Sequence, residues 1–124
     1  MKRDLDSVLI QARDAIQPVL DTYGFSLASE TFDYDAFSSA QIEYRHRTHW
    51  LRLNWDGKDR HLWLAAAISS DQHAHPGVAA WHSLDSASPP GMPATFLRPG
   101  PRTDARITEL VAQVERFHTS QAAV

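Results

Sequence analysis

The sequence predicts an α+β domain in which an antiparallel meander sheet of four to five strands packs one face against an N-terminal and a C-terminal helix. Three observations lead to this fold: apolar residues at helical spacing near both ends, alternating apolar and polar residues between them, and a hairpin turn within the alternating region. Because the chain has 124 residues, we expect a single domain over residues 1–124 with a core that needs neither disulfide nor metal.

The first helix is predicted from about residue 4 to residue 23, where apolar residues recur at steps of three and four. Asp4 or Asp6 can cap its first turn, and Gly24 can end it in the left-handed conformation. Pro18 lacks the N–H that an internal helical turn requires, so we expect a kink just before it or two shorter helices.

The second helix is predicted near the C-terminus, capped by Thr103 or Asp104, with an apolar stripe from residue 107 to residue 117 and a frayed end after it. The segment before it, residues 85–101, holds five of the seven prolines. We expect this segment to be a Pro-rich loop or strap, because long structureless loops are uncommon inside compact domains.

Three alternating runs, residues 40–46, 49–55 and 60–64, form the predicted meander, with the turn signal Asp56-Gly57 between the last two. Whether the loop after residue 55 has two or four residues, the same side chains of the following strand face the core, because the two loops differ by an even number of residues. The core face then carries Ile42, Tyr44, Leu51, Leu53, Leu62 and Leu64. The outer face carries Gln41, Glu43, Arg45, Trp50, Arg52, Asn54, His61 and Trp63.

Trp50 and Trp63 are predicted side by side on that outer face, where solvent-facing polar residues are the rule. Arg45 is expected beside Trp50, and Glu43 beside Arg52, as favourable cross-strand neighbours. Two interpretations stay open. The rings form a surface for recognition, or they are covered by the C-terminal segment, by an arginine side chain or by the second subunit of a homodimer.

An acidic and aromatic stretch over residues 30–37 follows a strand predicted over residues 25–31. Its carboxylates are Glu30, Asp33 and Asp35, and aromatic residues alternate with them. One interpretation is a loop whose rings hold it to the core while its acids face water. The other is a docking segment for a basic partner, where charge speeds the encounter.

The candidates for a metal site are His73, His75 and His82, because alternate residues of an extended segment can present two imidazoles to one side. Their spacing matches no specific zinc motif, so we expect solvated loop histidines and no cofactor. A histidine paired with Arg52 and Glu43 would instead resemble a small ribonuclease site. A small hydrolase or metal-dependent enzyme that uses the histidines is therefore the first alternative function.

Single-strand nucleic-acid binding is the second alternative, since Trp50 and Trp63 could stack bases while Arg45 and Arg52 contact phosphates. The net charge of −3 argues against it. The chain has no cysteine, which excludes disulfides and thiolate chemistry. With neither a signal peptide nor a membrane span visible, we expect a cytoplasmic protein without a membrane partner.

The order of the helix, Tyr23-Gly24-Phe25, the acidic-aromatic stretch and the run Leu51-Arg52-Leu53-Asn54-Trp55-Asp56-Gly57-Lys58 resembles small uncharacterised bacterial α+β proteins. In layout it is similar to the immunity proteins that accompany bacterial polymorphic toxins, over residues 5–68 and at Trp81-His82-Ser83-Leu84. The resemblance implies a non-enzymatic protein-binding module that neutralises a cognate toxin by covering its active site. It carries over no functional residue.

We expect the contact with such a partner to lie on the outer sheet face or on the acidic stretch. The residues concerned are Trp50, Trp63, Arg52, Arg45, Glu43 and His61, or else Glu30, Asp33 and Asp35.

Overall fold

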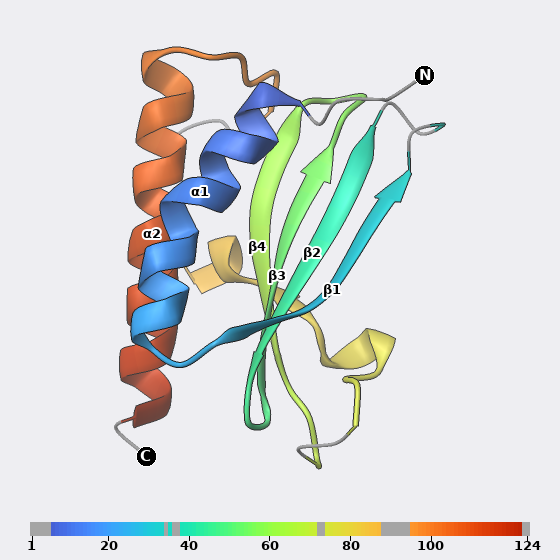
Figure 1. Ribbon diagram of the computed structural model, residues 1–124, viewed down its shortest axis with the longest axis vertical. Helices are drawn as coiled ribbons and strands as arrows, with labels where there is room; N and C mark the ends of the chain where they lie inside the picture. The colour runs from blue at the N-terminus through green and yellow to red at the C-terminus, as the bar shows by residue number, and fades with distance from the viewer. Residues whose placement is uncertain (1–5, 34, 36–37, 72–73, 88–94, 123–124) are drawn as a thin grey trace.

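The computed structural model describes residues 6–33, 35, 38–71, 74–87 and 95–122, and these form two layers (Figure 1). Helices α1 (Ser7–Thr22) and α2 (Pro101–Ala122) lie side by side on one face of a five-stranded antiparallel sheet in the order β1-β2-β3-β4-β5. The strands are β1 (Ser26–Asp33), β2 (Ser39–His46), β3 (His49–Asp56), β4 (His61–Ile68) and β5 (His82–Ser83). The short helices η1 (Val78–Ala80) and η2 (Leu84–Ala87) flank β5. The predicted α+β meander is confirmed.

The residues at both ends of helix α1 explain where it begins and ends. The Asp6 carboxylate accepts from the Val8 N–H at 2.8 Å and so caps the first turn. At the other end Gly24 adopts φ of 84°, and Phe25 N–H bonds back to the Leu20 carbonyl, which is the Schellman arrangement. Pro18 lies inside this one helix, so the predicted division into two shorter helices does not occur.

Helix α2 begins at Pro101, earlier than predicted. Proline suits the first helical position because its missing N–H would have no partner there and its φ is already helical. Thr103 and Asp104 therefore lie inside the first turn rather than capping it, and the Thr103 hydroxyl donates to the Arg98 carbonyl. The helix also continues to Ala122, through residues predicted to fray. Within the described ranges, neither helix has the length and apolar character needed to cross a membrane.

The prediction of which meander side chains face the core is confirmed. The turn between β3 and β4 spans four residues, 57–60, and Asp56 pairs with His61 across it. Backbone N–H groups of Lys58 and Asp59 donate to the Asp56 carboxylate and stabilise the turn. All six residues assigned to the core face are at most 1% exposed and belong to one core shared with both helices.

Strand β1 is longer than predicted and reaches Asp33, so the acidic stretch begins within the sheet and not in a loop. Its pairing with β2 shifts register between Leu27 and Ser29, which marks a bulge. The described part of the Pro-rich segment starts as η2 and resumes at Thr95, while residues 88–94 lie outside the described ranges.

Arg106 of α2 closes the part of the β4 edge that β5 leaves unpaired. It is 2% exposed, and its Nε and Nη2 donate to the Leu62 carbonyl at 3.1 and 2.9 Å. Nη1 and Nη2 also reach the Asp85 carboxylate, which accepts a third bond from Gln113. Burial by itself raises the pKa of Asp85, but the hydrogen bonds from Arg106 and Gln113 outweigh it and hold the pKa below its usual value. This cluster is structural.

Candidate functional site

The face of β1–β4 that points away from the helices is called the open face here, and it carries both Trp50 and Trp63. The two rings are not side by side, contrary to the prediction. Trp50 pairs with Ala67 across β3 and β4, whereas Trp63 pairs with Asn54. The step from Trp50 to Asn54 separates the two sites by about 13 Å along the strand. The alternation along the strands correctly predicted that both rings lie on one face. The register between β3 and β4 places them at opposite ends of that face.

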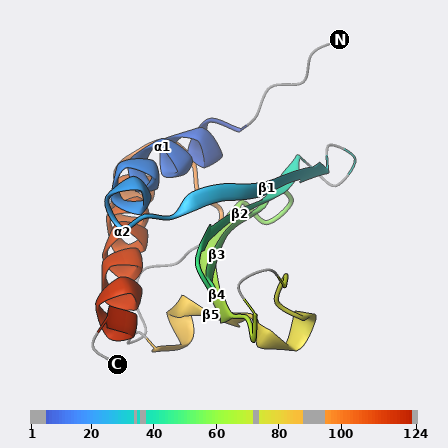
Figure 2. The same ribbon diagram turned by 60° about the horizontal axis from the view of Figure 1, so that its bottom comes forward.

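The Trp50 end is called the covered half, because residues 74–81 lie over it. This segment is called the strap from here on, and it precedes the Pro-rich segment 85–101 in the chain. Figure 2 shows η1 of this strap on the side of the sheet opposite the helices. The rings of His75 and Trp81 meet Trp50 edge to face, with centroids 5.0 and 6.5 Å away. Trp50 is consequently 6% exposed and belongs to a small second core.

Glu43 anchors the strap to the sheet. Nε and Nη2 of Arg52 donate to its Oε2 at 3.1 and 3.0 Å, and Nε2 of His75 lies 3.0 Å from its Oε1. The Arg52 guanidinium also lies over the Trp81 ring, 3.9 Å from its centroid. The predicted contact between Glu43 and Arg52 is thus confirmed. Arg45 also lies beside Trp50 as predicted, with its guanidinium carbon 5.8 Å from the centroid of the Trp50 ring.

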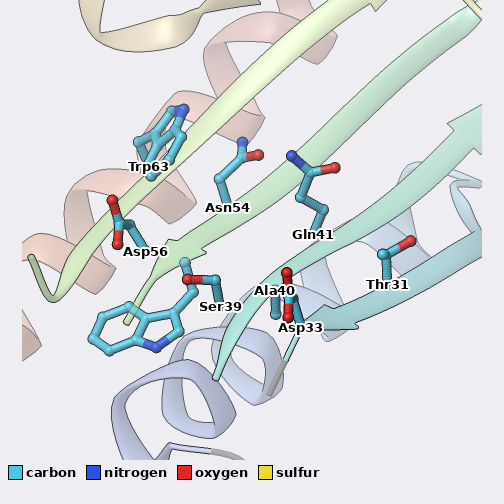
Figure 3. Close-up of a pocket in the computed structure, with 9 residues that line it drawn as sticks. Thr31, Asp33, Ser39, Ala40, Gln41, Asn54, Asp56 and Trp63 are labelled. Carbon is cyan, nitrogen blue, oxygen red and sulfur yellow. The ribbon is translucent and has the colours of Figure 1, made fainter. Parts of the chain in front are cut away.

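The other end of the open face, called the open half, holds a groove of about 360 Å³ (Figure 3). A single row of side chains crosses four strands here, because Thr31 pairs with Gln41, Gln41 with Asn54, and Asn54 with Trp63. Figure 3 shows these four side chains on the same side of the sheet. The remaining lining residues are Asp33, Ser39, Ala40, Trp55 and Asp56.

The groove carries two carboxylates, and no Lys, Arg or His is among the described residues that line it. Asp33 belongs to β1, where its Oδ1 accepts from the Asp35 N–H at 3.1 Å. Asp56 ends β3, where its Oδ1 accepts from the Lys58 N–H at 3.0 Å. Backbone groups therefore hold both carboxylates in place, and the groove is acidic and polar with an aromatic wall.

Trp63 forms that wall and is partly exposed. Its ring centroid lies 4.5 Å from that of His61, and the two planes are tilted by 37°. Burial lowers the pKa of His61, and the Arg106 cation lowers it further, while Asp85 opposes both. Burial and the Arg106 cation therefore both favour the neutral form of the imidazole beside Trp63.

The acidic residues predicted to act together do not share a face. Asp33 pairs with Ser39 and joins the groove, whereas Glu30 pairs with Ile42 and points to the helix side. Asp35 lies in the turn after β1 and is exposed. Strand pairing therefore takes one carboxylate of this stretch into the site.

The histidine candidates for a metal site are not gathered by the structure. His75 contacts Glu43 and Trp50, His82 is exposed on β5, and His73 lies outside the described residues. Over the described ranges, no group of three or more His, Cys, Asp and Glu side chains is arranged to hold a metal ion. The histidine that joins Arg52 and Glu43 is His75, which comes from the strap.

Alternation placed Gln41 and Asn54 on the correct face but could not connect them with Thr31. That connection needs the register of β1 against β2, and alternation alone gives no register across a pairing that contains a bulge. The strap contacts of His75 and Trp81 have no periodic signal in the sequence that could locate them.

Comparisons of the chain with protein-family models, with curated proteins and with solved structures find no match.

Proposed function

We propose that this protein is a non-enzymatic protein-binding module that docks its partner in the groove of the open half. The partner we propose is a bacterial toxin domain, which the protein neutralises by covering its active site. The single observation that carries the proposal is a groove of about 360 Å³ that crosses four strands and is walled by the partly exposed Trp63.

Trp63 has the properties of an interface anchor. Tryptophan is enriched among residues that dominate binding energy, particularly where polar neighbours surround it and exclude water. Here the amide of Asn54 pairs with Trp63, and Gln41 and Thr31 continue the row of polar side chains across the groove. A large ring beside groups that can each donate or accept a hydrogen bond suits a specific protein contact.

The composition of the groove supports binding over catalysis. Its hydroxyls belong to Thr31 and Ser39, and the described lining includes no His or Lys that could activate either one as a nucleophile. Neutralising an enzyme by covering it requires only shape and charge that fit the partner. The layout similar to immunity proteins makes a toxin domain the partner of choice.

The test is co-expression with the product of the gene adjacent to the one that encodes this chain. We expect that product to arrest bacterial growth alone, growth to recover when this protein is present, and the two purified proteins to bind in calorimetry. Trp63→Ala should weaken binding by about 2 kcal/mol or more and abolish the recovery.

A matched control is Val78→Ala, which removes an apolar side chain that is 95% exposed on the strap. It should leave affinity unchanged. An adjacent product that is neither toxic nor bound would overturn the immunity proposal. Unchanged affinity in Trp63→Ala would overturn the choice of the open half.

A hydrolase is the second candidate, because the structure brings together His75, Glu43 and Arg52. A general acid and a general base must flank the reacting atoms. Here Nε2 of His75 contacts the Glu43 carboxylate directly at 3.0 Å, and Trp81 stacks on Arg52, so the three groups engage one another. Incubation with RNA would decide: cleavage lost in both Glu43→Gln and His75→Ala would establish the enzyme, and no cleavage would remove it.

A further inference from the structure

We infer that the groove of the open half receives a cationic side chain of the partner protein, and that the guanidinium of an arginine fits it best. This inference rests on the proposed function, since it names the chemistry by which the partner would be recognised. It is carried by the charge of the groove, by the Trp63 wall and by a matching arrangement inside the same chain.

The lining of the groove is negatively charged. Asp33 and Asp56 both belong to it, with no Lys or Arg among its described lining residues. Two cations of the neighbouring strands and turn are held by other carboxylates: Arg52 is paired with Glu43, and Arg60 is paired with Asp6 at 2.8 Å. Lys58, in the same turn, is exposed, so the attraction a cation meets in the groove comes from the two carboxylates of its lining.

The Trp63 wall selects a planar cation. Guanidinium groups stack on indole faces and, unlike an ammonium, offer a flat fork of five N–H donors. The Asp56 carboxylate, on the strand next to Trp63, can accept from such a fork, while Asp33 on β1 adds negative charge at the far end of the groove. Asn54 can also accept from the fork, because its Nδ2 already donates to the Arg52 carbonyl at 3.1 Å and it retains its amide oxygen as an acceptor.

The covered half shows the complete arrangement within the chain. There the Arg52 guanidinium lies over the Trp81 ring at 3.9 Å and donates twice to the Glu43 carboxylate. The open half has the carboxylates and the indole of Trp63 along one groove of the same sheet. An arginine supplied from outside would reproduce the combination of ring, guanidinium and carboxylate.

The experiment uses a peptide probe, so that it needs no partner. Acetyl-Gly-Arg-Gly-amide is titrated into the full-length protein at low salt, and the indole N–H signal of Trp63 is followed by NMR. The control peptide replaces arginine by citrulline, which keeps the shape and removes the charge. We expect a saturable shift with arginine and at least about tenfold weaker binding with citrulline.

Two double variants separate groove charge from overall charge. Asp33→Asn with Asp56→Asn neutralises the groove while keeping an amide oxygen at each turn. Glu30→Gln with Asp59→Asn removes the same charge from exposed residues of the same two regions that do not line it. We expect the first to weaken arginine binding by roughly tenfold and the second to leave it unchanged.

Equal shifts with arginine and citrulline would overturn the inference, as would a shift produced by a neutral sugar such as methyl glucoside and not by arginine. The proposed function fails separately. If Trp63→Ala abolishes binding of the toxin partner but the groove-neutral variant binds it normally, the cationic side chain is wrong and the docking site stands. If the peptide binds but no toxin partner does, the groove chemistry stands and the immunity proposal falls.

Discussion

The two halves of the open face come from the same strands and the same alternation, yet they have opposite characters. In the covered half, Trp50 is 6% exposed beneath the strap and the charges of Glu43 and Arg52 satisfy each other. In the open half, Trp63 is partly exposed and walls a groove with two carboxylates. The position of an aromatic residue on an outer sheet face therefore does not predict whether it is buried or exposed.

The difference between the halves comes from the strap. His75 and Trp81 bring rings onto Trp50, and nothing comparable among the described residues lies on Trp63 apart from its strand neighbour His61. One half adds to stability, and the other holds the groove that we propose for binding.

Trp50→Ala should have the largest effect and separate the halves most clearly. Removing a buried ring leaves a cavity, so we expect a loss of about 3–5 kcal/mol in the free energy of unfolding. Trp63→Ala should lose about 1 kcal/mol, because its ring is already partly in water. Urea denaturation measures both, and equal losses would mean that the strap does not make the Trp50 end a core.

Glu43→Gln should destabilise the covered half next most strongly. The substitution leaves the Arg52 guanidinium, whose side chain is 19% exposed, without its counter-charge, so we expect a loss of about 2 kcal/mol. Gln41→Ala, two residues away on β2 in the open half, is the control and should change the free energy of unfolding by less than about 0.5 kcal/mol. A loss of similar size in the control would contradict the distinction.

His75→Ala should loosen the strap with a smaller effect on global stability. The His75 side chain is 53% exposed, so we expect a loss of about 1 kcal/mol or less. Local opening should nevertheless increase, seen as faster hydrogen exchange at the Trp50 indole N–H and unchanged exchange at Trp63. If exchange at Trp50 does not change, His75 does not hold the strap.

The smallest effect concerns the imidazole beside Trp63. The pKa of folded His61 lies below 6.5, so the unfolded chain takes up the proton first as pH falls. The contribution of His61 to stability is therefore present above pH 6.5 and is lost as pH falls through its folded pKa. His61→Gln should reduce the pH dependence of urea unfolding between about pH 7.5 and 5. Burial also lowers the pKa of His49, so the part of the pH dependence that His49 contributes should remain in this variant.

NMR titration of the His61 ring protons provides the direct check. A midpoint above 6.5 would contradict the sign of this prediction.

Much of the fold could be predicted because strand alternation and turn chemistry are local. Asp56-Gly57 and the phased leucines determined which side chains face the helices, and the core followed from them. The start of α2 was predicted too late because Pro101 was assigned to the loop before it, although proline favours a first helical turn.

The candidate site was less predictable because it depends on register across several strands. Glu43 beside Arg52 follows from one hairpin, whereas the row from Thr31 to Trp63 needs three correct pairings in succession. Each pairing shifts by whole residues with loop length and bulges, so small local differences accumulate into different neighbours.

That both tryptophans share one face follows from local alternation, which has a period of two along a strand and does not depend on distant residues. That Trp50 is buried and Trp63 is partly exposed depends on how distant segments pack together. The strap reaches Trp50 through contacts between residues far apart in the chain, and such contacts leave no periodic trace in the sequence. The acidic groove beside Trp63 lies on the part of that face which the strap does not reach.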